Sequence, residues 1–548
     1  MKKVGDGMRA TETPREIELK LELDPRDLPA LRRHPLLRPA FSAKSGTRDL
    51  LSTYFDTPDQ RLRQTGLTLR LRRSDGKLRQ TLKSVGASNA GLFDRSEWET
   101  DVAGDALDFK ATANTPLTPL LAEKGVRKAL APVFTVASKR STALVSGDGW
   151  GIEVTLDDGY VEAAGRKDAV CEVELELNAG SPGDLFRLAR ELASEVPLRL
   201  GIRTKADRGY ALLAGEGAQV VKSIDPALSP TMTAGEAFQA IARSCLEQLI
   251  ANEAALIQAR KPGAVHQMRV ALRRLRAAIS VFRKVVGDAA GTQVSAELKW
   301  MASMLSDARD LDVFIDKEVA PIRAKRPKNK DAAQLSAHFA RERDMAYDEA
   351  LAALGSDRYR LMLIDTATWI ETGDWLKKAG AAGKAAAKAK HSKRDAPVGE
   401  FAADELARRT KRVRKKGRRI SRMEIEERHQ LRISVKKLRY AAEFFSPVFA
   451  GLDAKTARRA GKFVQALELM QERLGDLNDA ATSASLSARL DRSDPGQLRA
   501  ARLLEHDDFG RAAEAMADAR KAYAAFAKAK PFWKKADKLV EIEEPTEA

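Results

Sequence analysis

Charged and apolar residues alternate along the segment from Glu16 to Lys20, whose sequence is EIELK. Successive side chains of a β-strand point to opposite faces, so the three charged residues would share one face and the two apolar residues the other. A single strand of this kind is typical of a sheet with one face in water. The alternation recurs, however, in later segments, namely Thr68–Arg72, Arg79–Lys83, Arg95–Glu99, Glu153–Asp157 and Glu172–Leu177.

The apolar faces of these strands must be buried, while their opposite faces carry both carboxylates and basic groups. Closing the strands into a barrel meets both demands, because the apolar faces can pack outward against helices and no strand edge stays exposed. The charged faces would then line the lumen, where buried charges need partners or metal ions. We therefore predict an α+β multidomain chain whose N-terminal part is an antiparallel β-barrel or tunnel with flanking helices. A sheet with its polar face in water is the alternative.

A lumen that carries both kinds of charge has a characteristic chemistry. Convergent arginines and lysines suit phosphate oxygens, and arginine can bind them through two nitrogens at once. Clustered glutamates suit hard divalent cations such as Mg²⁺ or Mn²⁺. Together the two sets describe a site for a metal-chelated polyphosphate.

Further motifs follow the ExExK pattern of Glu16, Glu18 and Lys20 in the chain. They are Tyr54–Pro58, Leu69–Arg72, Thr81–Lys83, Arg140, Asp157, Glu174–Leu177 and Thr204–Tyr210. In this order they resemble the CYTH superfamily, the triphosphate tunnel metalloenzymes, and most closely its bacterial inorganic triphosphatase branch. The resemblance implies metal-dependent hydrolysis of inorganic triphosphate or a short polyphosphate, with Mg²⁺ or Mn²⁺ as cofactor. A related tunnel acting on thiamine triphosphate, or cyclising ATP, is an alternative.

Carried over position by position, the resemblance implies three sets of site residues. The implied metal ligands are Glu16, Glu18, Asp157, Glu172, Glu174 and Glu176. The implied substrate-binding residues are Arg70, Arg72, Lys83, Arg140, Lys205 and Arg208. The remaining catalytic candidates are Lys20, on the phosphate chain, and Glu97 and Glu99, which would complete the carboxylate set. At every position the alternative is a salt bridge between strands, and that alternative is strongest for Arg208, Glu97 and Glu172.

The strand pattern stops after residue 213, and a helical spacing of Ala, Leu and Arg takes over. This second region contains an internal repeat, because the segment His266–Arg276 recurs as His429–Arg439. A duplicated helical motif predicts an all-α domain of two pseudo-symmetric bundles. The expected division of the chain is a tunnel domain at 14–213, a linker at 214–232, a helical domain at 233–530 with a low-complexity basic insertion at 377–400, and a tail at 531–548.

Basic residues of the repeat share a helix face, because spacings of three, seven and ten residues return to the same stripe. A solvated or ion-paired basic face is the ordinary interpretation of one such helix. Two copies with histidine at the same place, each followed by an acidic motif, resemble the CHAD domain, the conserved histidine α-helical domain. The resemblance implies binding of inorganic polyphosphate. The implied binding residues are His266, Arg269, Arg273, Arg274, Arg276, Lys284, Arg309, His429, Arg432, Lys436, Lys437 and Arg439.

The charge distribution agrees with a polyanionic partner for the second domain. Residues 1–213 hold 34 Lys or Arg and 31 Asp or Glu, so the remainder carries +15 of the net charge of +18. An aromatic content of 6% and the lack of a known nucleic-acid-binding motif argue against nucleic acid. We expect no membrane span, because no run of about 18 apolar residues occurs.

Two cysteines far apart and an N-terminus without an apolar segment lead us to expect a cytoplasmic protein. Polyphosphate binding would bring it to polyphosphate granules. The main alternative outside catalysis is a module that binds or targets polyphosphate without significant turnover.

Overall fold

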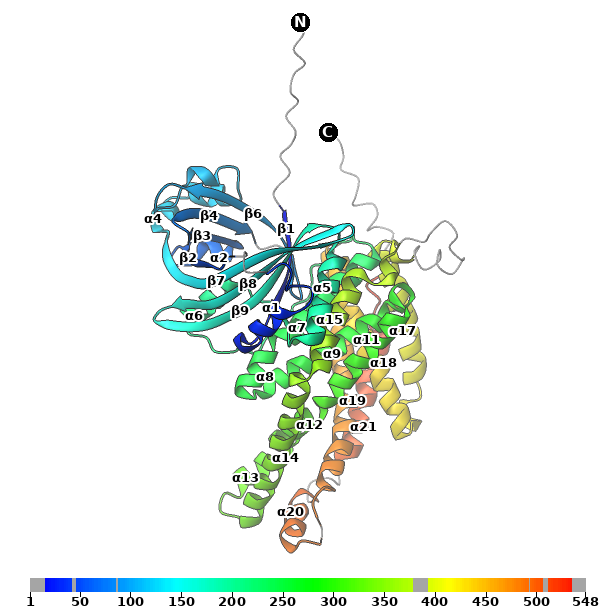
Figure 1. Cartoon of the computed structure of the whole chain (residues 1–548). Coiled ribbons are helices and arrows are strands. Elements are labelled where there is room, and N and C mark those ends of the chain that lie inside the picture. The colour runs from blue at the N-terminus through cyan, green and yellow to red at the C-terminus, as the bar shows by residue number, and fades with distance from the viewer. Residues whose placement is uncertain are drawn as a thin grey trace. The chain divides into compact units, whose positions relative to one another are not determined.

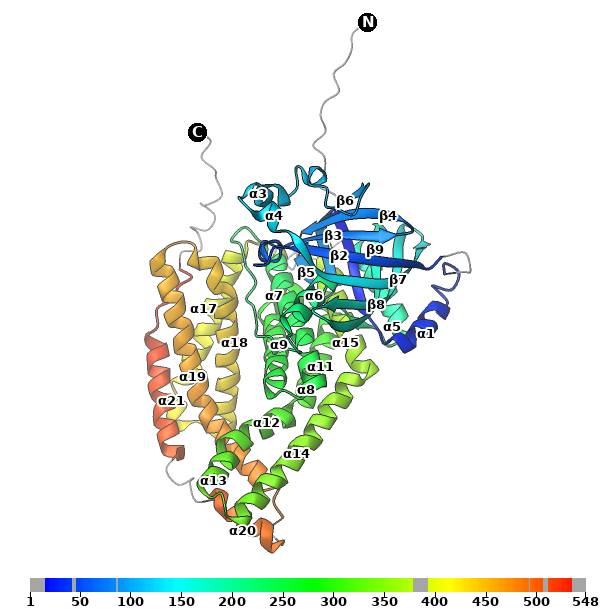
Figure 2. The same ribbon diagram turned by 90° about the vertical axis from the view of Figure 1, so that its left-hand side faces the viewer.

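The computed structural model describes residues 15–41, 46–84, 87–377, 393–491, 493–505 and 511–534. Two compact units make up the chain. The first contains Met1–Gln219 and the short segment Leu363–Thr368, and the second contains the rest. Figures 1 and 2 show the elements of each unit from two directions. The predicted insertion at 377–400 lies largely outside the described residues, and so does most of the predicted tail.

Strands of the first unit form a closed antiparallel barrel (Figure 1). Their order is β1, β9, β8, β7, β2, β3, β4 and β6, and β6 pairs back onto β1. The barrel strands are β1 (Arg15–Glu22), β2 (Arg48–Asp56), β3 (Leu67–Ser74), β4 (Lys77–Ser84), β6 (Leu92–Val102), β7 (Ala131–Gly147), β8 (Trp150–Ala163) and β9 (Arg166–Ala179). Short strands β5 (Ala87–Asn89) and β10 (Arg199–Leu200) add to β6 and β1. The predicted antiparallel barrel is confirmed.

The strand register turns the alternation of the sequence into an inner charged face and an outer apolar face. Lys20 lies opposite Glu174, and Arg140 lies opposite Asp157. The intervening Leu19 and Val173 are fully buried. Side chains of the outer face pack against short helices, which bury a leucine-rich core. The helices of this unit are η1 (Pro25–Asp27), α1 (Leu28–Arg33), α2 (Arg61–Gln64), η2 (Lys110–Thr112), α3 (Leu117–Ala122), α4 (Val126–Ala129), α5 (Pro182–Glu195) and α6 (Lys205–Ala214).

Helix α6 packs against an apolar part of the barrel interior. Its Tyr210 shares a buried core with Tyr54 and Phe134, and the Tyr210 hydroxyl donates a hydrogen bond to Asp56 at 2.6 Å. A Cβ at Gly209 would lie 2.3 Å from the Phe134 ring, so this close approach requires glycine. The helix therefore lies deep against the strands, and its first residue is Lys205.

The second unit is helical throughout its described residues, apart from one isolated β-bridge. Its first half contains α7 (Ala234–Ala251), α8 (Glu253–Ala259), α9 (Pro262–Val281), α10 (Arg283–Val286), α11 (Ala289–Met304), α12 (Ser306–Phe314), the π-helix η3 (Ile315–Val319), α13 (Ala320–Lys325), α14 (Lys330–Gly355), α15 (Asp357–Thr372) and η4 (Asp374–Leu376). Its second half contains α17 (Val398–Gly417), η5 (Ile420–Arg422), α18 (Ile425–Ala450), α19 (Ala454–Ser487), α20 (Pro495–Glu505) and α21 (Arg511–Lys528). In the described part of the chain, no helix combines the length and apolar character needed to cross a membrane.

The two copies of the sequence repeat form helices α9 and α18. Helix α9 packs against α7 and α11, helix α18 packs against α17 and α19 in the same way, and α9 and α18 contact each other. Figure 2 shows the two groups of helices within this unit. The predicted all-α architecture of two similar bundles is confirmed.

Candidate functional site

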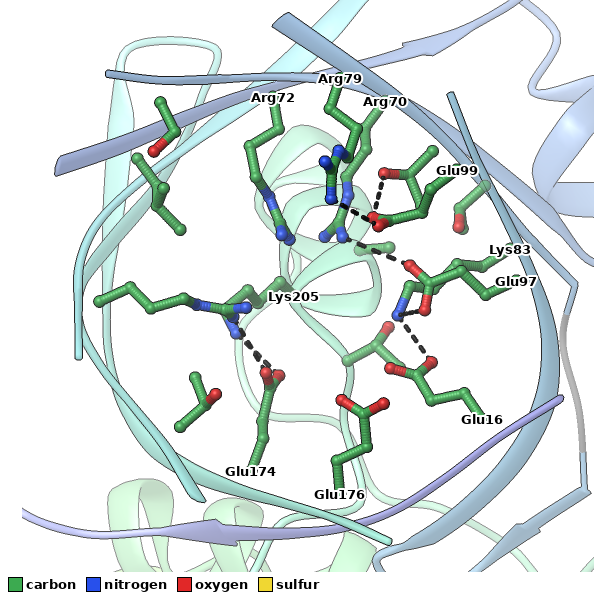
Figure 3. Close-up of a pocket in the computed structure, with 18 of the residues that line it drawn as sticks. Glu16, Arg70, Arg72, Arg79, Lys83, Glu97, Glu99, Glu174, Glu176 and Lys205 are labelled. Atoms are coloured by element: carbon green, nitrogen blue, oxygen red, sulfur yellow. Dashed lines mark hydrogen bonds and ion pairs between the residues drawn. The ribbon is translucent and has the colours of Figure 1, made fainter. Parts of the chain in front are cut away.

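The barrel holds a cavity of about 1090 Å³ whose lining is strongly charged. Figure 3 shows Arg70, Arg72 and Arg79 on one side of the cavity. Glu16 and Glu176 lie on the other side (Figure 3). Arg79 was not selected from the sequence, whereas the other four residues were. Further predicted site residues in the lining are Lys20, Lys83, Glu97, Glu99, Arg140, Glu174 and Lys205. The inner faces of several strands thus bring together most of the residues that the sequence selects.

Arg72 is a cation of this cavity that has no carboxylate partner among the described residues. Its Nε donates a hydrogen bond to the Ser52 hydroxyl at 3.4 Å. Burial and the charges of Arg70 and Arg140 lower the pKa of the Arg72 guanidinium to about 9. A buried charge is costly unless a partner supplies the opposite charge. The basic side of the cavity therefore favours entry of an anion.

The opposite side of the cavity carries an excess of negative charge, centred on Glu176. Within the described part of the chain, Glu176 has no hydrogen bond or ion pair, and it lies opposite Glu153 in the strand register. Burial and the charges of Glu16 and Glu153 raise the pKa of the Glu176 carboxyl to about 7. Carboxylates crowded in this way favour a hard divalent cation.

The carboxylates of the ExExK motif are held by two cations. Lys83 Nζ lies 2.8 Å from Glu16 and 2.9 Å from Glu97. Arg95 lies 3.1 Å from Glu16 through Nε and 2.5 Å from Glu18 through Nη2. Glu18 is nearly fully buried. These pairs keep the motif's carboxylates in fixed positions next to Glu176.

Glu97 and Glu99 lie beside the basic side of the cavity. Glu97 is 3.9 Å from the Arg70 guanidinium. Glu99 accepts a hydrogen bond from Arg79 at 3.2 Å and another from the Thr81 hydroxyl at 3.0 Å. Burial alone would raise the pKa of Glu99, but Arg70 and the Thr81 hydroxyl lower it. Both glutamates are therefore partners of the cations, which is the salt-bridge alternative for these positions.

Buried ammonium groups neutralise three carboxylates at the edge of the cavity next to α6. Lys205 Nζ lies 2.7 Å from Asp157 and 3.0 Å from Glu174, and it also contacts Glu172. Lys20 Nζ lies 2.8 Å from Glu172 and 3.1 Å from Glu174. Lys20 and Lys205 are only 2% and 7% exposed. Oxygens of the three carboxylates lie within 4.8 Å of one another, a spacing that suits a metal ion, but lysine nitrogens already contact all three.

Four predicted residues do not line the cavity. Glu18 is nearly fully buried and contacts Arg95. Asp157 and Glu172 are fully buried and do not line the cavity, because each pairs with a buried lysine. Arg208 does not line the cavity either, since it pairs with Glu22 at 2.8 Å and with Asp168 at 3.2 Å. It lies three residues after Lys205 on α6, and helical spacing alone does not show which of the two reaches the cavity.

Arg95, Glu153 and Tyr54 line the cavity but were not selected from the sequence. Arg95 has the same strand parity as Glu97, and Glu153 has the same parity as Asp157, so the period of two could have identified both. The Tyr54 hydroxyl accepts a hydrogen bond from Arg70 at 3.3 Å. Tyr54 begins one of the motifs that resemble the CYTH superfamily, but a tyrosine alone does not indicate a place in the cavity, because tyrosine is common in strands.

In the helical unit, predicted residues gather near the first turns of α9. Burial and the charges of Arg309, Arg273 and Arg269 lower the pKa of His266 to about 4, so the imidazole is neutral at pH 7. The Arg273 Nε donates to the hydroxyl of Tyr440 on α18 at 3.4 Å, which links the two repeat helices. The arginines repel one another, although Asp310 and Asp307 offset part of this effect at Arg269. An anion between the arginines would relieve the remaining repulsion.

Other predicted residues of the repeat differ in their surroundings. Arg274 is buried and forms an ion pair with Asp225, and Arg439 pairs with Glu443. On α18, His429 is exposed while Arg432 and Lys436 are half-buried. The remaining predicted residues are Arg276, Lys284 and Lys437, which lie on α9, α10 and α18. The side chains of Asn478 and Asp479, in the second acidic motif, lie outside the described residues.

Comparison with known proteins identifies the same two regions. Residues 14–210 match the CYTH domain family, and residues 240–488 match the CHAD domain family. A Haemophilus influenzae protein named inorganic triphosphatase is 31% identical over 203 residues, which cover 36% of this chain and 54% of that protein. An uncharacterised Mycobacterium tuberculosis protein is 26% identical over 341 residues, covering 58% of this chain and 63% of that one. The chain thus spans little more than half the length of these relatives.

Among solved structures, the CHAD domain of the plant Ricinus communis is 27% identical with a TM-score of 0.47. It covers 57% of this chain and 98% of that one.

Proposed function

We propose that this chain, in which a CYTH domain is followed by a CHAD domain, hydrolyses inorganic triphosphate or a short inorganic polyphosphate with the aid of a divalent metal ion. The two family matches and the similarity to a protein named inorganic triphosphatase support a triphosphatase. The charge distribution inside the barrel supports the inorganic substrate and the metal.

The proposal rests mainly on the charges of one cavity, which has an excess of positive charge on one side and an excess of negative charge on the other. Arg72 faces other arginines without a carboxylate partner in the described structure, and Glu176 faces other carboxylates without a cation. A single anion would neutralise the first group and leave the second unrelieved. A polyphosphate that carries a divalent cation supplies both opposite charges at once.

The residues that would hold the metal are Glu16, Glu18 and Glu176. Their fit to a divalent cation rests on the crowding that raises the pKa of Glu176 to about 7. Asp157 and Glu172 are less suited, because both are fully buried, do not line the cavity and lie beside buried lysines rather than beside Glu176. A bound Mg²⁺ or Mn²⁺ would supply Lewis acidity at the terminal phosphoryl group.

The phosphate chain would lie along Arg70, Arg72, Lys83 and Arg140, which neutralise its oxygens and fix its direction. Water attacks the terminal phosphorus in line with the bridging oxygen, and the P–O bond to that oxygen breaks. The products from tripolyphosphate are orthophosphate and pyrophosphate. Cationic side chains on both sides of the breaking bond stabilise the charge on the transferred and leaving groups.

The proposal is tested by tripolyphosphate hydrolysis with the full chain, with Mg²⁺ or Mn²⁺, in the wild type and in Arg72→Gln. Loss of a charged hydrogen-bond donor to phosphate is worth about 1.5–3 kcal/mol, so kcat/KM should fall about 10- to 150-fold. The matched control is Arg73→Gln, because Arg73 is the next residue, is exposed and pairs with Asp105 at 2.8 Å. Equal effects of the two substitutions would contradict the assignment of the cavity as the substrate site.

For the helical unit, we propose binding of longer inorganic polyphosphate at the basic faces of the repeat helices. The support is the cluster around His266, where three arginines repel one another near a neutral imidazole. Recognition would be mainly electrostatic and therefore sensitive to salt. Such binding would keep the triphosphatase close to polyphosphate granules.

A further inference from the structure

The two repeat helices carry basic residues at equivalent positions, but their surroundings are not equivalent. A shift of 163 residues relates Arg274 on α9 to Lys437 on α18, and Arg276 on α9 to Arg439 on α18. If the repeat extended to the surroundings of these residues, both members of each equivalent pair would have a counter-charge, or both would lack one. The structure shows instead that one member of each pair is neutralised and the other is not.

Arg274 and Arg439 are the neutralised members. Arg274 forms an ion pair with Asp225 and lies over the ring of Phe444 at 5.2 Å. Arg439 contacts Glu443, and its Nε donates to Gln471 Oε1 at 2.9 Å. Burial raises the pKa of Glu443, although the charges of Arg439 and Arg274 oppose that rise. This side of the helix pair thus supplies its own counter-charges.

Arg276 and Lys437 are the members that lack a counter-charge. No hydrogen bond or ion pair reaches either side chain from the described residues, and the Arg276 Nε is buried without a partner. Burial and the charges of Arg409, Arg276 and Arg412 lower the pKa of the Lys437 ammonium. The two residues therefore lie in one positively charged region, although they come from different copies of the repeat.

Helix α17, which is outside both copies of the repeat, supplies the rest of this region. The α17 cluster is defined as Arg276, Arg409, Arg412, Lys416 and Lys437. Two hydrogen bonds hold it in place: Arg409 Nη2 donates to the Ser280 carbonyl of α9 at 2.7 Å, and Lys416 Nζ donates to the Ser434 hydroxyl of α18 at 3.4 Å. The cluster thus bridges three helices rather than covering one solvated face.

Neutralisation of the α17 cluster from within the described structure is incomplete. Its nearby carboxylate is Glu405, which is 3% exposed and lies 3.1 Å from Arg409. Glu405 is shared with Arg408, and Lys284 lies 3.8 Å away. One carboxylate cannot balance this many cations, and like charges held together in a partly buried region destabilise it. A polyanion of closely spaced charges would relieve the excess.

We propose that the α17 cluster is a docking site of inorganic polyphosphate on the helical unit, in addition to the arginines around His266, and that the side around Arg274 and Arg439 is not a docking site. The proposal rests on the polyphosphate-binding function proposed above and adds which side of the helix pair the chain uses. It also adds Arg409, Arg412 and Lys416, which belong to neither copy of the repeat. Phosphate oxygens would accept hydrogen bonds from Arg276 and Lys437, whose side chains have no other acceptor in the described structure.

The test measures the binding of long-chain polyphosphate to the full chain by isothermal titration calorimetry at several salt concentrations. The double variant Arg412→Gln/Lys437→Gln removes two exposed cations of the α17 cluster. Its affinity should fall about tenfold or more, and the dependence of affinity on salt should weaken by one to two units of slope.

Two matched variants complete the design. Lys411→Gln removes an exposed charge from α17 at a position rotated away from the cluster, and Arg439→Gln removes the repeat equivalent of Arg276. Each should change affinity less than about twofold, with the melting temperature showing that the helices remain folded. If Arg439→Gln or Lys411→Gln lowered the affinity for polyphosphate as much as the double variant, the α17 site would be overturned. Polyphosphate binding by the chain would still stand. No binding by the wild-type chain would overturn both.

Discussion

Removing the ammonium group of Lys205 should destabilise the barrel unit strongly. Its Nζ lies 2.7 Å from Asp157 and 3.0 Å from Glu174 and contacts Glu172. In Lys205→Met, Glu172 and Glu174 keep Lys20 at 2.8 and 3.1 Å, and Asp157 keeps Arg140. Removal of one partner from a buried ion pair costs about 3–5 kcal/mol. The remaining cations compensate in part, so we expect a loss near the lower end, about 3 kcal/mol.

The assay is thermal unfolding of the full chain at pH 7. For a unit of this size, 1 kcal/mol corresponds to about 2–4 °C, so the barrel transition should fall by about 6–12 °C. The control is Lys167→Met, because Lys167 is an exposed lysine that lies 3.5 Å from Glu162 on the same sheet. An exposed pair contributes about 0–1 kcal/mol. Similar small shifts in both variants would refute a structural role for the buried charges.

The pH dependence of the Lys205 effect has a definite sign. Burial alone would raise the pKa of Asp157, but Lys205 and Arg140 lower it. Burial alone would lower the pKa of Lys205, but Asp157 raises it. Stability from these groups is present above the unfolded carboxylate pKa of about 4 and below the unfolded lysine pKa of about 10.4. The difference in the free energy of unfolding between the wild type and Lys205→Met should be largest at pH 7 and should shrink below about pH 4.

The remaining predictions concern the charges of the cavity that have no partner in the described structure. Arg72→Met should leave the melting temperature of the ligand-free protein unchanged or raise it, because it removes a charge that lies among Arg70 and Arg140; a drop as large as that of Lys205→Met would count against a binding role. Mg²⁺ should raise the melting temperature more at pH 8 than at pH 6, because Glu176, with a pKa of about 7, is mainly ionised only at the higher pH. Glu176→Gln should remove that pH difference, and equal protection at both pH values in the wild type would exclude Glu176 as a ligand.

Much of the fold could be predicted because its signals are local in sequence. A period of two puts Glu16, Glu18 and Lys20 on one face whatever the rest of the chain does. The need to bury the residues between them then favours a closed barrel. The repeat likewise identifies α9 and α18 as equivalent helices before any packing is known.

The pairing of charges could not be predicted, because it depends on distances that the sequence does not contain. Lys205 and Arg208 lie one turn apart on α6, yet one reaches the buried carboxylates and the other pairs with Glu22. Arg274 and Arg276 differ in the same way on α9. Position on a helix limits the direction of a side chain, whereas the neighbouring helices and strands decide whether it meets a carboxylate.

The central claim is that the barrel breaks a phosphoanhydride bond rather than merely holding a polyphosphate. It is tested most directly by following tripolyphosphate with the full chain by ³¹P NMR, first with a chelator and then with Mg²⁺ or Mn²⁺. We predict that orthophosphate and pyrophosphate appear together in equal amounts after the metal is added, and that neither appears before. A tripolyphosphate spectrum that broadens on binding but yields no product with either metal would contradict the claim and leave the cavity as a binding site.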